Sequence, residues 1–303
     1  MGLYDFYRSY ISKCESEMEI LSSVHDEPTL LPQSLRTESL YLTCYAFASV
    51  SLLHLFLLTM IRFNKKSKKK LRDDFNSIQN SYQATNFCVN LSLGLYGLYT
   101  WIRVVPGLYT VSATDKIIGF HQFVPFSAAQ LGYNMWSIPM GALVIGESKA
   151  MLGHHVAAFI VSFLASFFTI GYRYYNPFFL GFYELSSVPL AIMNSFKNNR
   201  EWANKNSPIS FITAKVLFAV FYLLIRVFLG TPQMYDNMRI ATLLFITCES
   251  NYCRFIVGIF AILAYFLALL QYVWGYMVVS GLYSVYKGKA NTTTPDANTE
   301  KKD

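Results

Sequence analysis

Apolar residues dominate seven long stretches of the chain, and short polar segments separate them. A membrane-spanning helix needs about 20 mostly apolar residues, and each stretch reaches about that length. The sequence therefore predicts an all-α fold, a polytopic membrane helical bundle of about seven transmembrane helices. The predicted spans are Leu40–Ile61, Ala84–Val105, Ile117–Met140, Glu147–Gly171, Pro177–Phe196, Pro208–Gly230 and Phe255–Tyr283.

Prolines mark where these helices start, bend or stop. Ser207 followed by Pro208 is typical of an N-cap with proline at the first helical position. Proline lacks a backbone donor, so Pro125 and Pro139 should kink or end the third helix. Pro189 should do the same to the fifth helix.

Composition agrees with a membrane protein. Of 303 residues, 53% are hydrophobic and 14% are charged, against about 25% charged residues in soluble domains. The net charge of +7 could suggest a nucleic-acid partner, but seven of the 25 basic residues fall between Arg62 and Arg72, directly after an apolar run. That position indicates a topology signal and a contact with anionic lipid, and we expect no nucleic-acid partner.

The positive-inside rule orients the predicted spans. The Arg62–Arg72 run, the Lys197–Lys205 loop and the tail from Lys287 all fall on one side of seven spans, which is then the cytosolic side. The first 38 residues, with seven acidic and three basic groups, are expected in the lumen. We divide the chain into a lumenal segment (1–38), a first helix with its basic cytosolic loop (39–77), a larger helical domain (78–288) and a disordered cytosolic tail (289–303).

The adjacent histidines His154 and His155 are the first candidates for chemistry. They open an apolar run from Val156 to Ile170. An ionisable group is costly inside a membrane, so it is a functional candidate by default. Histidine also changes charge nearest to neutral pH. The alternative is that both histidines are interfacial and bind lipid headgroups.

Glu184 is the second candidate, followed by Ser186 and Ser187 in an apolar segment. Such a carboxylate faces a cavity, or it packs between helices against a neighbouring hydroxyl. If the fourth span starts near Glu147, the depths of His155 and Glu184 differ by about 7 Å. A start at Leu152 roughly doubles that gap. We expect His155, more than His154, to face Glu184.

Other polar residues of the spans have plain structural explanations. His54 and His121 are expected to be packing or interfacial residues more often than ligands. Arg226 can extend to the interface, an alternative of equal weight to a contact with a lipid headgroup. Gln271 and Trp274 suit hydrogen bonding and packing between helices. The order of motifs that contain these residues nevertheless resembles a known family.

The family is the TLC domain, which unites ceramide synthases, translocon-associated membrane proteins and ceroid-lipofuscinosis relatives, and the resemblance covers about residues 78–288. It implies an endoplasmic-reticulum or related endomembrane protein with a helical bundle around a lipid-accessible cavity. In ceramide synthases the paired histidines are required for N-acylation of a sphingoid base by acyl-CoA, and they match His154 and His155. We also take Glu184, Ser187, Arg226, Gln271, Trp274 and His121 as candidates for lipid binding. The motifs are Gly132-Tyr133, Met151-Leu-Gly-His154-His155, Tyr183-Glu184-Leu-Ser-Ser187, Leu217-Phe-Ala-Val-Phe-Tyr-Leu-Leu-Ile-Arg226-Val and Leu270-Gln271-Tyr-Val-Trp274.

Two departures shape the functional hypothesis. Relatives often carry an aspartate a few residues after the Gly-Tyr pair, where this chain has the segment Asn134–Ser137, and Glu147 is the sole acidic residue near the histidines. The chain thus looks more like the small TLC proteins of the ceroid-lipofuscinosis branch, which are linked to membrane-lipid homeostasis.

We therefore expect a protein of lipid homeostasis that binds or senses a lipid or acyl chain in its bundle. The alternatives are a ceramide-synthase-like N-acyltransferase, with acyl-CoA as co-substrate, and a non-enzymatic adaptor or cargo receptor. We expect no cofactor or metal, and we expect membrane lipids as partners. Whether the chain forms a homo-oligomer is left open. Cys248 and Cys253 fall in a predicted lumenal loop, where a disulfide is allowed but not required.

Overall fold

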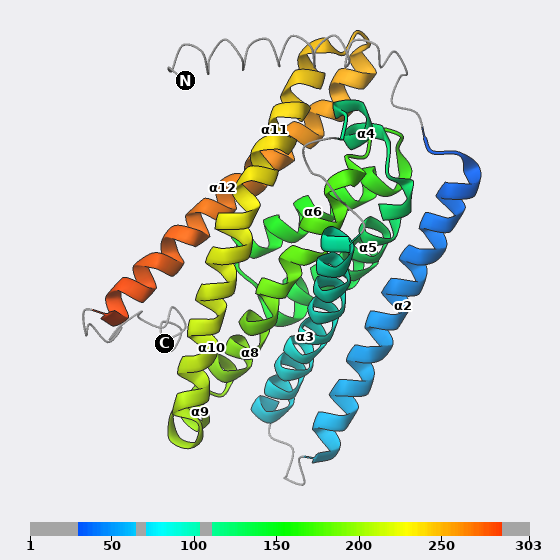
Figure 1. The fold of residues 1–303 in the computed structure, drawn as a ribbon. Coiled ribbons are helices and arrows are strands. Elements are labelled where there is room, and N and C mark those ends of the chain that lie inside the picture. The colour runs from blue at the N-terminus through cyan, green and yellow to red at the C-terminus, as the bar shows by residue number, and fades with distance from the viewer. Residues whose placement is uncertain (1–29, 65–70, 104–110, 287–303) are drawn as a thin grey trace, which may run out of the picture.

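The computed structural model describes residues 30–64, 71–103 and 111–286, and these residues form an all-α bundle (Figure 1). Within them no β-strand forms, and Leu30 and Phe168 make a single antiparallel bridge. The predicted fold class is confirmed. The elements are α2 (Gln33–Asn64), α3 (Leu71–Arg103), α4 (Ala113–Ile118), η1 (His121–Phe123), α5 (Val124–Pro139), η2 (Met140–Ile145), α6 (Lys149–Phe167), η3 (Arg173–Tyr175), α7 (Asn176–Phe179), η4 (Phe182–Ser186), α8 (Ser187–Asn198), α9 (Arg200–Asn206), α10 (Pro208–Phe221), η5 (Tyr222–Leu229), α11 (Gly230–Thr247) and α12 (Asn251–Tyr286).

Four helical segments of the described chain are long and apolar enough to cross a membrane. They match the first, fourth, sixth and seventh predicted spans and identify an integral membrane protein. The total of seven spans stays a prediction. The four segments are Gln33–Phe63, Lys149–Phe167, Pro208–Thr247 and Asn251–Tyr283.

Several segments for which the sequence makes predictions fall outside the described residues. These are most of the lumenal segment 1–38, residues 65–70 of the basic loop, and the tail 289–303 with its sequon at Asn291.

The third predicted span is interrupted, as its prolines suggest. Pro139 ends α5, and the π-helix η2 follows. Pro125, in contrast, stands in the first turn of α5 and begins that helix, so its predicted kink is wrong. The difference follows from position, because proline fits the first helical turn, where backbone donors have no partner in the helix.

The fifth predicted span is also broken, but not at Pro189. The break lies before it, where α7 ends and Gly181 leads into the 3₁₀ segment η4. Pro189 stands in the first turn of α8, which tolerates it.

Two glycines let η4 approach α3. A Cβ added to Gly181 would lie 2.8 Å from the Cα of Gly97, and one added to Gly97 would lie 2.6 Å from the Cα of Gly181. Both positions therefore need glycine, because no side chain fits between these backbones. This contact holds the irregular segment that carries Glu184 inside the bundle.

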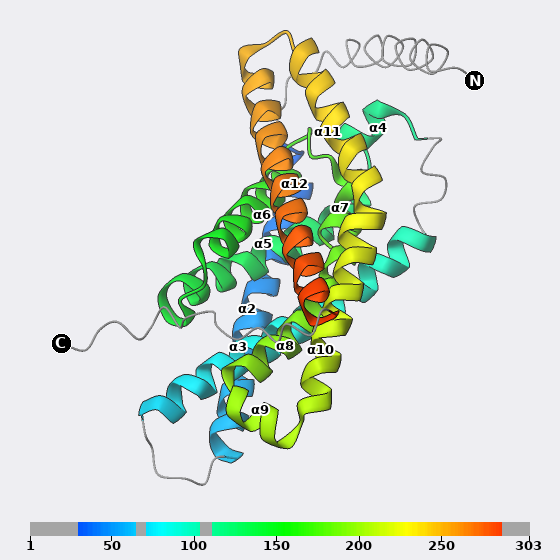
Figure 2. The ribbon, with the colours of Figure 1, turned by 90° about the vertical axis from the view of Figure 1, so that its left-hand side faces the viewer.

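The sixth helix is much longer than predicted. Pro208 does begin α10, although Ser207 makes no side-chain cap bond, and the helix continues past Gly230 to Thr247. Its 40 residues measure about 60 Å, twice the hydrocarbon thickness. α11 and the first part of α12 therefore rise together as a hairpin beyond the start of α2, as both views show (Figures 1 and 2).

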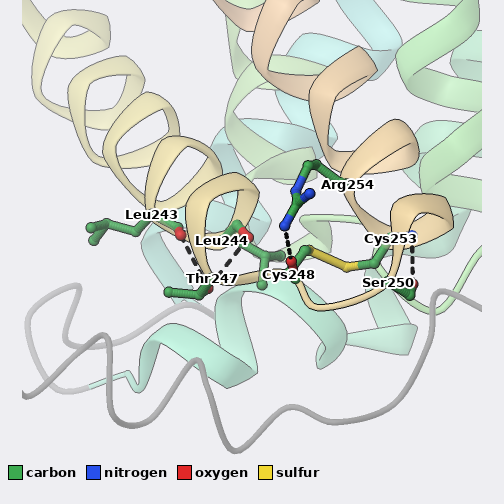
Figure 3. The surroundings of a disulfide bond; sticks show 7 residues. All are labelled: Leu243, Leu244, Thr247, Cys248, Ser250, Cys253 and Arg254. Atoms are coloured by element: carbon green, nitrogen blue, oxygen red, sulfur yellow. Dashed lines mark hydrogen bonds between the residues drawn. A yellow bond between two sulfur atoms is a disulfide. The ribbon is translucent and has the colours of Figure 1, made fainter.

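A disulfide closes the tip of this hairpin. Cys248 and Cys253 are bonded, with their Cα atoms 5.8 Å apart. Arg254 donates a hydrogen bond of 2.8 Å to the carbonyl of Cys248, and the Ser250 hydroxyl accepts one from the Cys253 amide (Figure 3). The disulfide that the sequence allowed is thus present in the structure.

Candidate functional site

A cavity lies inside the bundle, with an empty volume of about 870 Å³ that includes its open mouth. We call it the bundle cavity. Its middle is apolar, with Ala158, Val161, Phe179, Leu180 and Leu267 among the lining residues. Gln130, Glu184, Arg226 and Gln271 line the cavity and are linked by hydrogen bonds and an ion pair, and together with His154 we call them the polar end. Tyr172 packs on Phe260, far from Gln271 along α12, and we call the lining residues Tyr172, Tyr175, Asn176 and Asn237 the tyrosine end.

Arg226 is the centre of the polar end. It lies in η5, a π-helix, an element that is often found at functional sites. The side chain is 7% exposed. Its Nε donates to the Ser186 hydroxyl at 2.5 Å, its Nη1 to Gln271 Oε1 at 3.4 Å, and its Nη2 to the Ser187 hydroxyl at 3.0 Å. The alternative that Arg226 extends to the membrane interface is therefore wrong.

Glu184 balances the charge of this arginine. Its Oε2 lies 3.9 Å from Arg226 Nη2 and accepts a hydrogen bond of 3.0 Å from Ser187. Its Oε1 accepts a longer one, 3.4 Å, from Gln130 Nε2. Glu184 thus combines both readings of the sequence, since it lines a cavity and also bonds a neighbouring hydroxyl.

His154 is the histidine that lines the bundle cavity. Its ring packs edge-on against Trp274, with centroids 5.5 Å apart. Its Nδ1 is buried and has no hydrogen-bond partner. A buried polar atom without a partner costs free energy, so a ligand that supplies one is favoured here.

His155 points elsewhere, which corrects the expectation that it faces Glu184. Its Nδ1 lies 3.2 Å from Asn134 Oδ1, and its Nε2 lies 3.6 Å from Glu147 Oε2. Tyr82 donates a hydrogen bond of 2.9 Å to the other Glu147 oxygen. Adjacent helical residues point about 100° apart, so one of the pair must face away from the cavity.

The remaining candidates divide between the site and its surroundings. Gln271 lines the cavity and accepts from the Tyr222 hydroxyl at 2.9 Å. Ser187 and Trp274 each contact a residue that lines the cavity. Ser187 donates a hydrogen bond to Glu184, and the ring of Trp274 packs against that of His154. His121 is exposed at the start of η1 and is not among the residues that line the cavity.

Sequence reasoning missed several residues of the site. Gln130 and Tyr183 line the cavity, and Tyr222 anchors Gln271. None carries a sequence signal, because glutamine and tyrosine are ordinary residues of packed helices. Glu147 and Asn134 were noted only as departures from the family pattern. In the structure they are the two polar contacts of His155.

Of three comparisons with known proteins, the one with family models found a match. The family model of the TLC domain matches residues 76–280, about two thirds of the chain. A search of curated proteins found no match, and neither did a search of solved structures. The matched region contains every residue that lines the bundle cavity. It also contains His155 and the residues around it, Asn134, Glu147 and Tyr82. The chain therefore belongs to the TLC domain family and is a lipid-related integral membrane protein.

Proposed function

We propose that the chain binds or senses a lipid or acyl chain in the bundle cavity and acts in membrane-lipid homeostasis, in the endoplasmic reticulum or a related endomembrane. The observation that carries the proposal is the cavity itself, apolar in the middle and polar at one end. Small-molecule sites have this composition, mostly apolar with a few placed polar groups.

The energetics suit an amphiphile. Each methylene that enters the apolar middle gains about 0.8 kcal/mol. The polar end holds Glu184 and Arg226 in fixed hydrogen bonds, so it meets a headgroup without reordering long side chains.

A tryptophan scan of α12 tests the proposal. Leu267 lines the cavity, whereas Leu269 on the same helix is 62% exposed. Leu267→Trp should fill the cavity and abolish binding of a fluorescent fatty-acyl probe to the purified protein. Leu269→Trp is the matched control and should bind the probe as the unaltered protein does. Equal binding by both variants would overturn the proposal.

N-acyltransferase activity is the second candidate. Two observations favour it: the unpartnered Nδ1 of His154 in the cavity, and the carboxylate of Glu147 beside His155. An imidazole can accept the proton that an amine loses as it attacks a thioester. Purified protein incubated with acyl-CoA and a sphingoid base tests this candidate. Product formation that His154→Ala abolishes would establish the enzyme.

The adaptor hypothesis makes the opposite prediction for the same cavity. A cargo receptor without lipid chemistry should keep its cellular function when Leu267→Trp fills the cavity. A rescue assay in cells that lack the protein, scored by lipid profile, separates the two proposals.

A further inference from the structure

The charged side chains at the polar end of the bundle cavity balance each other. Among the residues that line the cavity, Arg226 is the one cation of lysine or arginine type and Glu184 the one carboxylate, and they lie 3.9 Å apart. Nε, Nη1 and Nη2 of Arg226 all donate to protein acceptors. An anionic headgroup would therefore add an uncompensated charge to a buried site, which is unfavourable.

The polar end does have an unused hydrogen-bond acceptor. Gln130 is 4% exposed, and its Oε1 is buried without a partner while its Nε2 is held by Glu184. A carbonyl oxygen only accepts, so this atom is available to a donor group of a ligand. The unpartnered Nδ1 of His154 at the same end either donates or accepts, according to its tautomer.

The opposite end offers a different group. Tyr172 is 3% exposed, its hydroxyl is buried without a partner, and its ring packs on Phe260 at 4.9 Å. Phe260 and Gln271 both line the cavity from α12 and stand 11 residues apart, which is about 16 Å of helix. One small headgroup cannot reach both ends, so the chain of the ligand must occupy the space between them.

We infer that the cavity selects an uncharged lipid whose headgroup carries a hydroxyl, of the glyceride class, with the headgroup at the polar end. This inference rests on the proposed function and names its ligand. The hydroxyl donates to Gln130 Oε1 and pairs with His154 Nδ1, and the acyl chain runs along the apolar middle toward Tyr172. Charge balance excludes the phosphorylated form of the same lipid.

A matched pair of probes tests the selectivity. Monooleoylglycerol and oleoyl lysophosphatidate share the acyl chain and glycerol and differ in the phosphate. The purified full-length protein in uncharged detergent should bind monooleoylglycerol at least about tenfold more tightly, a difference of 1.4 kcal/mol. Equal binding of the two probes, or tighter binding of lysophosphatidate, overturns the inference but is still consistent with the proposed lipid binding. Binding of neither probe overturns the proposed function as well.

Substitutions test at which end of the cavity the headgroup binds. Gln130→Leu should weaken the binding of monooleoylglycerol to the protein about tenfold. Tyr174→Phe is the control, because the Tyr174 hydroxyl is equally buried and unpartnered but lies outside the cavity. A larger loss with Tyr172→Phe than with Gln130→Leu would put the headgroup at the other end and overturn the inference.

Glu184→Gln leaves Arg226 without its counter-charge and should narrow or reverse the preference against lysophosphatidate. An unchanged preference in the folded variant, checked by gel filtration, would contradict the charge argument. Should that variant fail to fold, the wild-type comparison of the two probes still decides the inference.

Discussion

His154 and His155 have ring centroids 5.8 Å apart, yet they belong to two different polar clusters. His154 lines the bundle cavity, while His155 points about 100° away around α6 and contacts Asn134 and Glu147. The paired motif thus places one histidine at the cavity and the other in a polar contact between α6 and its neighbours.

The two histidines should respond differently to substitution. His154→Ala should weaken ligand binding with little loss of stability, since its Nδ1 bonds nothing in the protein. His155→Ala should lower the free energy of unfolding by about 1–3 kcal/mol, because it leaves Asn134 and Glu147 short of a partner. Thermal unfolding and probe binding measure the two effects. If the double alanine variant restores the lipid profile of null cells fully, neither histidine serves a lipid site.

Removing one member of the buried ion pair should destabilise the bundle. Arg226→Met leaves the Glu184 carboxylate buried and unpaired, a loss of about 3–5 kcal/mol. The double variant with Glu184→Gln should recover much of this loss, because no charge is then left unpaired. Thermal unfolding in detergent measures both. Arg200→Met on the exposed face of α9 is the control, and a double variant no more stable than Arg226→Met would contradict the pairing.

The contact between α3 and η4 should tolerate no side chain at Gly97. Gly97→Ala should lower stability by about 1–3 kcal/mol through overpacking against the backbone of Gly181. Gly281→Ala on α12 meets nothing within 4 Å and should be neutral or gain up to about 1 kcal/mol from helix propensity. Melting temperatures of the two variants compare the positions directly, and equal values would refute the close approach.

The disulfide at the hairpin tip should form in cells. Mass spectrometry of the non-reduced tryptic peptide between Arg239 and Arg254 should show it lighter by the mass of a hydrogen molecule than after reduction. Cys248→Ser should cost about 2 kcal/mol, the entropy of closing so short a loop. Two free thiols in the native protein would show that the hairpin tip is reduced.

The topology predicts which sequon stays free of glycan. Asn291 begins an Asn-Thr-Thr sequence in the tail that the positive-inside rule places in the cytosol. Translation with microsomes should leave it unglycosylated. A glycan removed by endoglycosidase and lost in Asn291→Gln would reverse the orientation.

The hydrophobic pattern by itself determined the fold class and most of the long helices. Length and apolarity located α2, α6, α10 and α12, because a bilayer requires about 20 apolar residues of any spanning helix. Motif order pointed to the family that the TLC domain match then showed. It also selected Glu184, Arg226, Gln271 and His154, which the structure brings to one end of a cavity.

Pattern could not decide where the irregular segments lie or which histidine faces inward. The break at Gly181 depends on the close approach of Gly97 from another helix, and the long continuation into α11 depends on packing against α12. The roles of Gln130 and Glu147 arise from partners 54 and 65 residues away. Such contacts join residues that are distant in the chain, so no local periodicity reports them, and only the folded bundle decides which polar atoms share a site.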